Sequence, residues 1–148
     1  MKLEVLPRTK LVIAYLSILF VATIGELTAQ TNSISIKDVT NDKYALDNLL
    51  DGINSENDGV KRSSIYFAGH YRIAEAEEAL IEQLKKELNP SNRILIALVL
   101  YELVSEDGLL EVKKLASNDD NQKVRRMSTH IYNEFLTKDF KKEFSLGN

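Results

Sequence analysis

Ile94 to Tyr101, with the sequence ILIALVLY, is the stretch that decides the fold. Taken alone, a continuous apolar run of this length predicts a buried strand as readily as a buried helix. Register settles the choice, because apolar residues at helical spacing recur over 60–71 and 124–135, one period before it and one period after it. A helix that is apolar nearly all round must be covered on most sides, which suits the middle one of three equivalent helices.

Polar residues mark the period of this repeat as clearly as apolar ones. Asn57, Asn89 and Asn121 are spaced by 32, and a basic residue follows each asparagine by four. Downstream of each asparagine the apolar positions follow one face of an amphipathic helix. A second set of apolar pairs recurs at a spacing of 31: Leu50 and Ile53, Ile81 and Leu84, Val112 and Leu115. The pattern indicates a repeated unit of two helices.

We therefore predict an all-α fold, built as a stack of antiparallel helical hairpins with about three repeats. The asparagines are expected to cap the first helix of each hairpin, and Pro90 fits the first helical position after Asn89. The predicted helices are 44–54, 58–72, 75–88, 90–104, 108–117 and 122–136. The predicted boundaries are a signal peptide at 1–29, a polar linker at 30–43, helical repeats at 44–137 and a capping segment at 138–148.

Three short motifs inside the repeat carry a resemblance to a known family. They are Val60-Lys61-Arg62, Ala68-Gly69, and Glu78-Ala79-Leu80-Ile81-Glu82-Gln83-Leu84. Together they resemble the short bacterial HEAT-like repeat over residues 44–136, although the second copy (Asn92-Arg93-Ile94) keeps only the basic residue. The resemblance implies an α-solenoid. Related repeat proteins act mainly as scaffolds, some are chromophore-lyase subunits and one branch handles damaged DNA, and the fold alone does not choose among these functions.

The first 29 residues have the parts of a cleavable signal peptide in the required order. A basic head is followed by Leu11–Ile24, an uncharged apolar run shorter than the roughly 20 residues that span a bilayer. Ala29 supplies the small residue that a signal peptidase needs, so we predict cleavage after it and export to the periplasm or the medium. The alternative is an uncleaved anchor, since a short helix can span a locally thinned bilayer.

Composition excludes several classes of function. The chain has 148 residues and no cysteine, which removes disulfides, thiolate metal sites and a lipid-carrying cysteine. Residues 30–148 contain 16 basic and 20 acidic side chains. A mildly acidic domain lacks the positive surface that phosphate contacts require, so we do not expect nucleic acid as a partner.

No motif in the chain carries recognisable catalytic chemistry. His70 and His130 are placed by the repeat two units apart, too far to share a metal ion, and His70 is expected on a solvated face. The acidic stretch Ser117–Asn121 lacks the spacing of a calcium loop and is better explained as a capped turn. We predict that the protein is not an enzyme and that it uses no cofactor, metal or small-molecule substrate.

Lys61, Arg93 and Arg125 need a separate explanation, because a cation in the first turn of a helix opposes the helix dipole. In stacks of the kind that the resemblance implies, a basic residue here reaches a carboxylate or carbonyl of the adjoining repeat and forms a ladder. We favour this structural role over the alternative, which is ligand binding.

The leading functional hypothesis is an interaction or scaffold module that docks an unidentified protein. Stacked hairpins present a surface lined by their second helices. On this surface we expect the outward side chains Asp47, Asp51, Glu78, Glu82, Leu109 and Lys113. The alternative is an accessory subunit tethered to the membrane by an uncleaved N-terminus.

Both ends of the domain carry a short predicted feature. Ser33–Ile36 alternates like a strand, and we expect it to lie extended against the helices. At the other end Phe140 and Phe144 are one helical turn apart, which predicts a last helix over 138–145. We expect it to fold back as a cap on the last repeat, the alternative being a free peptide that docks into a partner.

Overall fold

The structure is a computed structural model that describes residues 33–146, with side chains described as far as Lys138. The predicted signal peptide and the first residues of the predicted linker lie outside the described residues. Within 33–146 the fold is all-helical, as predicted, and no strand is formed. The helices are α2 (Ile36–Val39), α3 (Ala45–Ile53), α4 (Asp58–His70), the 3-10 turn η1 (Ala74–Ala76), α5 (Glu77–Lys86), α6 (Pro90–Glu102), α7 (Glu106–Asn118) and α8 (Gln122–Leu146).

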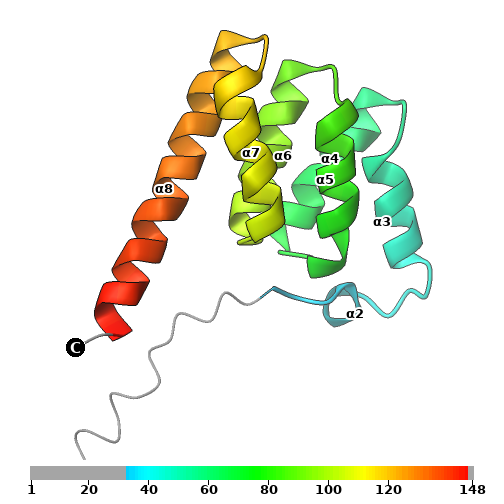
Figure 1. Cartoon of the computed structure of the whole chain (residues 1–148). Coiled ribbons are helices and arrows are strands. Elements are labelled where there is room, and N and C mark those ends of the chain that lie inside the picture. Colours follow the sequence, from blue (N-terminus) through cyan, green and yellow to red (C-terminus); the bar gives the residue numbers. More distant parts are fainter. Residues whose placement is uncertain (1–32, 147–148) are drawn as a thin grey trace, which may run out of the picture. The chain divides into compact units, whose positions relative to one another are not determined.

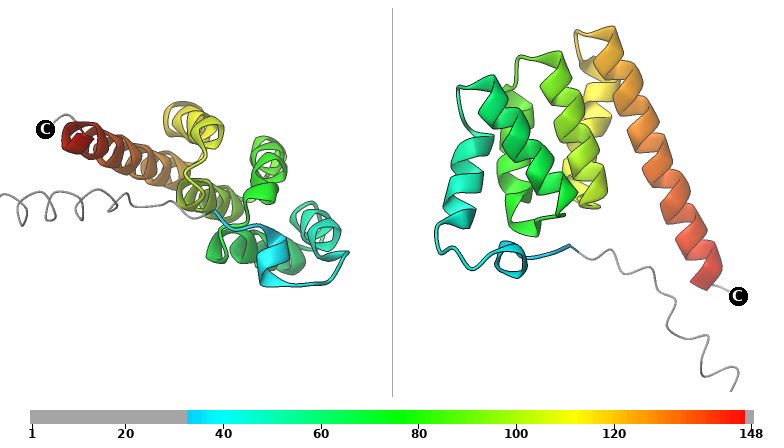
Figure 2. Two further views of the ribbon diagram at one scale, coloured as in Figure 1. Left: turned by 90° about the horizontal axis from the view of Figure 1, so that it is seen from below. Right: turned by 180° about the vertical axis from the view of Figure 1, so that it is seen from behind.

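The longer helices form two layers (Figures 1 and 2). One layer consists of α3, α5 and α7, and the other of α4, α6 and α8. Helix α6 is the central element, because it packs against α4, α5, α7 and α8. This central position explains why the ILIALVLY run is apolar nearly all round.

Asparagine side chains start the three helices of the second layer, as predicted. Asn57 accepts from the backbone N–H groups of Gly59 and Val60. Asn89 accepts from Ser91, with Pro90 at the first helical position, and Asn121 accepts from the next turn of α8. Each side chain satisfies N–H groups that have no partner inside the helix.

Helices α4 and α6 end in the same way, at equivalent positions of the repeat. Arg72 (φ 50°) and Val104 (φ 56°) both adopt the left-handed conformation just after their helices. In each case the next residue donates its N–H to a carbonyl of the last turn, Ile73 to Ala68 at 2.9 Å and Ser105 to Leu100 at 3.0 Å. These bonds define Schellman motifs, in which glycine is the usual left-handed residue.

The core lies between the two layers and centres on α6. Ile65, Leu80, Ile96, Leu100 and Val112 are all fully buried. Gly69 permits the close approach of α4 to α6, since a Cβ atom on it would lie 2.6 Å from a methyl carbon of Val99.

Asn92 is the polar exception in this core. It occupies the position at which the equivalent helices have an apolar residue, and it is completely buried. Its amide oxygen accepts from Arg62 at 2.9 Å and its amide nitrogen donates to Asp58 at 2.6 Å. Both partners belong to α4, so this residue connects two helices of the same layer through satisfied hydrogen bonds.

The predicted extended segment is present only over 33–35, because Ile36 already begins the helix α2 within the predicted linker. Ile34 forms an isolated parallel bridge with Ile73, donating to the carbonyl of Arg72 at 2.9 Å. Ser35 then caps the short helix α2, which places Ile36 in the core. The N-terminal segment is thus attached to the turn between α4 and α5.

The predicted separate helix at 138–145 is wrong. Helix α8 continues unbroken to Leu146 (Figure 1). Neither glycine nor proline occurs within it, and the Thr137 hydroxyl donates to the carbonyl of Asn133 at 2.8 Å instead of capping a new helix. Phe140 and Phe144, which were expected to cover the last repeat, lie beyond the described side chains.

Candidate functional site

Two of the three basic residues in the repeated series form ion pairs between helices. The Lys61 ammonium lies 3.1 Å from a carboxylate oxygen of Glu87, and both side chains are largely buried. Arg93 binds Asp119 with two contacts, at 2.7 Å through Nε and 2.9 Å through Nη2. We call the series Lys61, Arg93 and Arg125 the basic ladder. Its expected structural role is confirmed for these two pairs, which tie the first turn of α4 to the end of α5 and that of α6 to the end of α7.

The same two carboxylates also shape the turns in which they lie. Glu87 accepts the backbone N–H of Asn89 at 2.8 Å, and Asp119 accepts that of Asn121 at 2.8 Å. Each carboxylate therefore fixes the asparagine that caps the next helix of the layer formed by α4, α6 and α8. It also binds a cation on the preceding helix of that layer. The acidic stretch at 117–121 is accounted for in this way, as the predicted capped turn.

The side chains of Glu87 and Asp119 are the most deeply buried charged groups in this arrangement. Burial pushes the pKa of the Glu87 carboxyl upward, but hydrogen bonds from the Asn89 backbone and from the Gln83 and Lys61 side chains outweigh that effect. The pKa consequently lies below its ordinary value, and the side chain is ionised at neutral pH.

The predicted interaction face contains a groove between α5 and α7. We call it the α5–α7 groove; among the residues that line it are Glu78, Ile81 and Glu82 from α5 and Leu110, Lys113 and Lys114 from α7. Three of the predicted residues, Glu78, Glu82 and Lys113, are brought together here. Asp47 and Asp51 are exposed as predicted, but they lie on α3 and do not line the groove.

Leu109 does not belong to this face. It is 1 % exposed and part of the core, whereas Leu110 is 52 % exposed and lines the groove. The error has a simple origin. A spacing of 31 relates α3 to α5, but α5 and α7 are related by 32, as the fully buried pair Leu80 and Val112 shows. The structural counterpart of Glu78 is therefore Leu110.

Charge is distributed unevenly along the α5–α7 groove. Acidic side chains gather where the two helices begin, and lysines gather toward their ends. Some of the acids are already engaged, since Glu77 accepts from Ser105 at 2.6 Å and Glu111 lies 2.8 Å from Lys114. No hydrogen bond or ion pair engages Glu78 or Glu82 within the described part of the chain. Leu110 is therefore an exposed leucine in a groove that is otherwise lined mainly by charged side chains.

The histidines lie on the surface of different helices, as predicted for His70. His70 stacks on Tyr66 with ring centroids 5.6 Å apart and meets Tyr71 edge-on at 4.8 Å. His130 lies on α8. In the described part of the chain, no group of acidic or histidine side chains is arranged to hold a metal ion.

Comparison with known proteins does not identify a relative. No family model matches the chain, and no match is found among curated proteins or solved structures. Of the helices within 33–146, none is both long enough and apolar enough to cross a membrane.

Sequence reasoning missed two residues of functional or structural weight. Leu110 was overlooked because it is adjacent to a second leucine, and only its spacing from Glu78 distinguishes the exposed one. Asn92 was recognised as a break in an apolar column, but its partners on α4 could not be read from spacing. Both signals are present in the sequence once the register of α7 is known.

Proposed function

We propose that this protein is a short stack of HEAT-like helical hairpins that acts, without enzymatic activity, as a protein-interaction module outside the cytoplasm. The support for the stack is local and repeated. Capping asparagines, turn carboxylates, basic residues and left-handed helix ends all recur at one spacing with the same contacts. The support for export is the ordered basic head, apolar run and small residue at 1–29.

The α5–α7 groove is the proposed docking site, and the exposure of Leu110 carries the proposal. A leucine at 52 % exposure in the middle of a helix gains nothing from water. The groove that it lines also contains Ile81, the acids Glu78 and Glu82, and several lysines. Apolar contact at the centre with charges at the rim is the usual anatomy of a protein interface.

The chemistry of the groove defines the partner that it fits. A segment with an apolar side chain over Leu110 and basic side chains toward Glu78 and Glu82 would match both features. The partner we propose is therefore a protein, not a nucleic acid, a small molecule or a membrane surface. A membrane becomes relevant only if the N-terminal segment is retained as an anchor.

The proposal is tested by photo-crosslinking in the producing cell. A photoreactive amino acid is placed at Leu110 and, in a matched variant, at Leu136, which is 45 % exposed on α8 and outside the groove. We expect position 110 to give a discrete adduct with one other protein, and position 136 to give none with that protein.

A second variant relates the adduct to the chemistry of the groove. Adding Glu82→Lys to the chain that carries the crosslinker should weaken the adduct, because it reverses a charge that faces the partner's basic residues. Equal adducts from positions 110 and 136, or an adduct that Glu82→Lys leaves unchanged, would contradict the proposal.

A further inference from the structure

Arg125 differs from the other members of the basic ladder in what it binds. Lys61 pairs with Glu87 and Arg93 with Asp119, so in both cases the carboxylate comes from the turn that precedes the next helix of the same layer. No carboxylate lies within ion-pair distance of Arg125 among the residues that the structure describes. Within the described residues, Arg125 therefore has no acidic partner equivalent to Glu87 or Asp119.

The Arg125 guanidinium is nevertheless held in place. Its Nη1 donates to the carbonyl oxygens of Asp119 at 2.6 Å and Asp120 at 3.1 Å. Nη1 of Arg93 donates in the same way to two carbonyls of the preceding turn. In Arg93 the remaining edge, Nε and Nη2, holds a carboxylate. The same edge of Arg125 carries no carboxylate among the described residues, and the two carbonyl bonds fix its position in advance, which lowers the entropy lost when a carboxylate binds.

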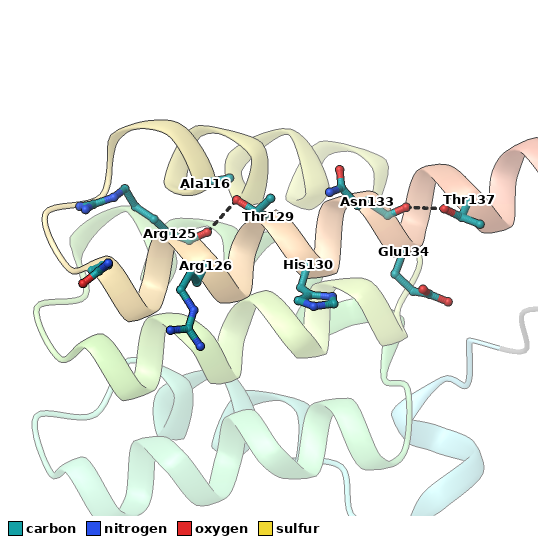
Figure 3. A pocket seen from close by; sticks show the side chains of 9 residues that line it. Ala116, Arg125, Arg126, Thr129, His130, Asn133, Glu134 and Thr137 are labelled. Atoms are coloured by element: carbon teal, nitrogen blue, oxygen red, sulfur yellow. Dashed lines mark hydrogen bonds between the residues drawn. The ribbon is translucent and has the colours of Figure 1, made fainter.

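The surroundings of Arg125 favour an anion. It lines a hollow along α8 together with Arg126, Thr129, His130 and Asn133 (Figure 3). We call this the α8 hollow. Its only acidic lining residue is Glu134, nine residues further along the helix, a rise of about 13 Å. The Arg125 side chain reaches back toward the turn before α8, whereas Arg126 and His130 point to another side of the helix (Figure 3).

We infer that the α8 hollow binds an acidic segment of a partner protein, with an aspartate or glutamate carboxylate on the Nε and Nη2 edge of Arg125. The geometry required is the one that Asp119 already adopts on Arg93, at 2.7 and 2.9 Å. Asn133, about two helical turns further along the same side of α8, adds an amide group for a further oxygen of that segment (Figure 3).

A protein segment fits the hollow better than other anions do. Residues 30–148 carry four more acidic than basic side chains, so a long polyanion such as nucleic acid is repelled by the rest of the surface. A short acidic segment within a partner protein avoids this repulsion. The hollow is separate from the α5–α7 groove, so either site can fail without the other.

The probe for the experiment is taken from the chain itself. A capped peptide with the sequence of Ser117–Gln122 (SNDDNQ) carries the carboxylate that fits Arg93. A matched peptide has asparagine in place of both aspartates. The protein is expressed from the full chain with ¹⁵N labelling, and binding is followed by NMR. We expect saturable shifts at the first turns of α8 with the acidic peptide, with a Kd on the order of 1 mM, and none with the neutral one.

Three substitutions distinguish the bidentate site from general charge attraction. Arg125→Gln should weaken binding at least about tenfold, which is a loss of roughly 1.4 kcal/mol. Arg125→Lys keeps the charge but lacks the planar edge, so it should weaken binding nearly as much. Lys123→Gln removes an equal charge from an exposed position of the same helix that does not line the hollow, and should change the Kd less than about twofold.

General charge attraction, a small anion or a second copy of this chain at the α8 hollow would each give a different result. Equal losses in Arg125→Gln and Lys123→Gln, or shifts that do not saturate, would overturn the inference. Inorganic phosphate that competes at the same concentration as the peptide would make the hollow a small-anion site and would also overturn it. Concentration-dependent dimerisation that Arg125→Gln abolishes would identify a second copy of this chain as the source of the carboxylate, contrary to the inference.

Discussion

Leu100 belongs to the ILIALVLY run and is completely buried. Leu100→Ala removes this burial and leaves a cavity between the layers, so we expect it to lower the free energy of unfolding by about 2–5 kcal/mol. Leu136→Ala is the control, since that leucine is 45 % exposed, and it should cost less than about 1 kcal/mol. Denaturant melts of the two variants give the comparison. Similar losses would mean that the assigned core is wrong.

The backbone conformation of Val104 destabilises the folded protein. A β-branched residue at φ 56° is strained, and the equivalent position after α4 is occupied by arginine. Val104→Gly relieves this strain at the expense of greater freedom in the unfolded chain, so we expect a net gain of about 0.5–1.5 kcal/mol. Val104→Ala keeps a Cβ atom and should gain less. Thermal melts at neutral pH measure both, and a loss of stability on Val104→Gly would contradict the Schellman geometry.

The contact of Lys61 with Glu87 connects two elements, the start of α4 and the end of α5. The pKa of Glu87 is lower in the folded protein than its ordinary value of 4.5. Its ionised form therefore contributes stability above about pH 4.5, and this contribution is lost as the pH falls below that value. Glu87→Gln removes the charge, so at pH 7 it should cost about 1–3 kcal/mol.

The pH profile checks this assignment. The difference in stability between Glu87→Gln and the unchanged protein should shrink as the pH is lowered from 7 to below the folded pKa of Glu87. Other carboxyls, including Glu75, whose pKa is lowered mainly by a hydrogen bond from Ser35, contribute equally to both proteins and cancel in the difference. A stability difference that does not change with pH would show that Lys61 and the hydrogen bonds of the turn do not lower the pKa of Glu87.

At the same scale, some elements were predictable from the sequence and others were not. The helices α4, α6 and the start of α8 were predicted closely because each begins with an asparagine cap in a fixed register. Helix α7 begins at Glu106, two residues before the predicted start, because its cap Ser105 does not follow the asparagine pattern. Leu109 was mistaken for a surface residue for a separate reason, the spacing of 32 instead of 31 between α5 and α7. The unbroken α8 was missed because a repeat predicts a turn where the local sequence contains no residue that ends a helix.

For the whole molecule, the prediction with the most direct consequence concerns the N-terminus. If the signal peptide is removed as proposed, the protein recovered from the producing cell should begin at Gln30. N-terminal sequencing of the mature protein tests this. A protein that begins at Met1 would instead favour the membrane-tethered alternative.

The candidate site was predictable at the level of the face, but not of the groove. Helical spacing indicated which side of α5 and α7 is exposed, and Glu78, Glu82 and Lys113 lie there as expected. The way in which Arg125 is held could not be foreseen, because its two carbonyl contacts depend on the exact geometry of the preceding turn. Sequence spacing placed Arg125 in the ladder, and only the structure distinguishes it from Arg93.

The central claim is that residues 30–148 form one metal-free stack of helices, stabilised by contacts between neighbouring hairpins. It is tested most directly by thermal unfolding, followed by far-UV circular dichroism and by tyrosine fluorescence, with and without a chelator. Because each hairpin buries only part of its apolar surface alone, we predict a helical spectrum and one cooperative transition at the same temperature for both probes, unaffected by the chelator. A spectrum with substantial strand, two separate transitions, or helix lost on adding the chelator would contradict the claim.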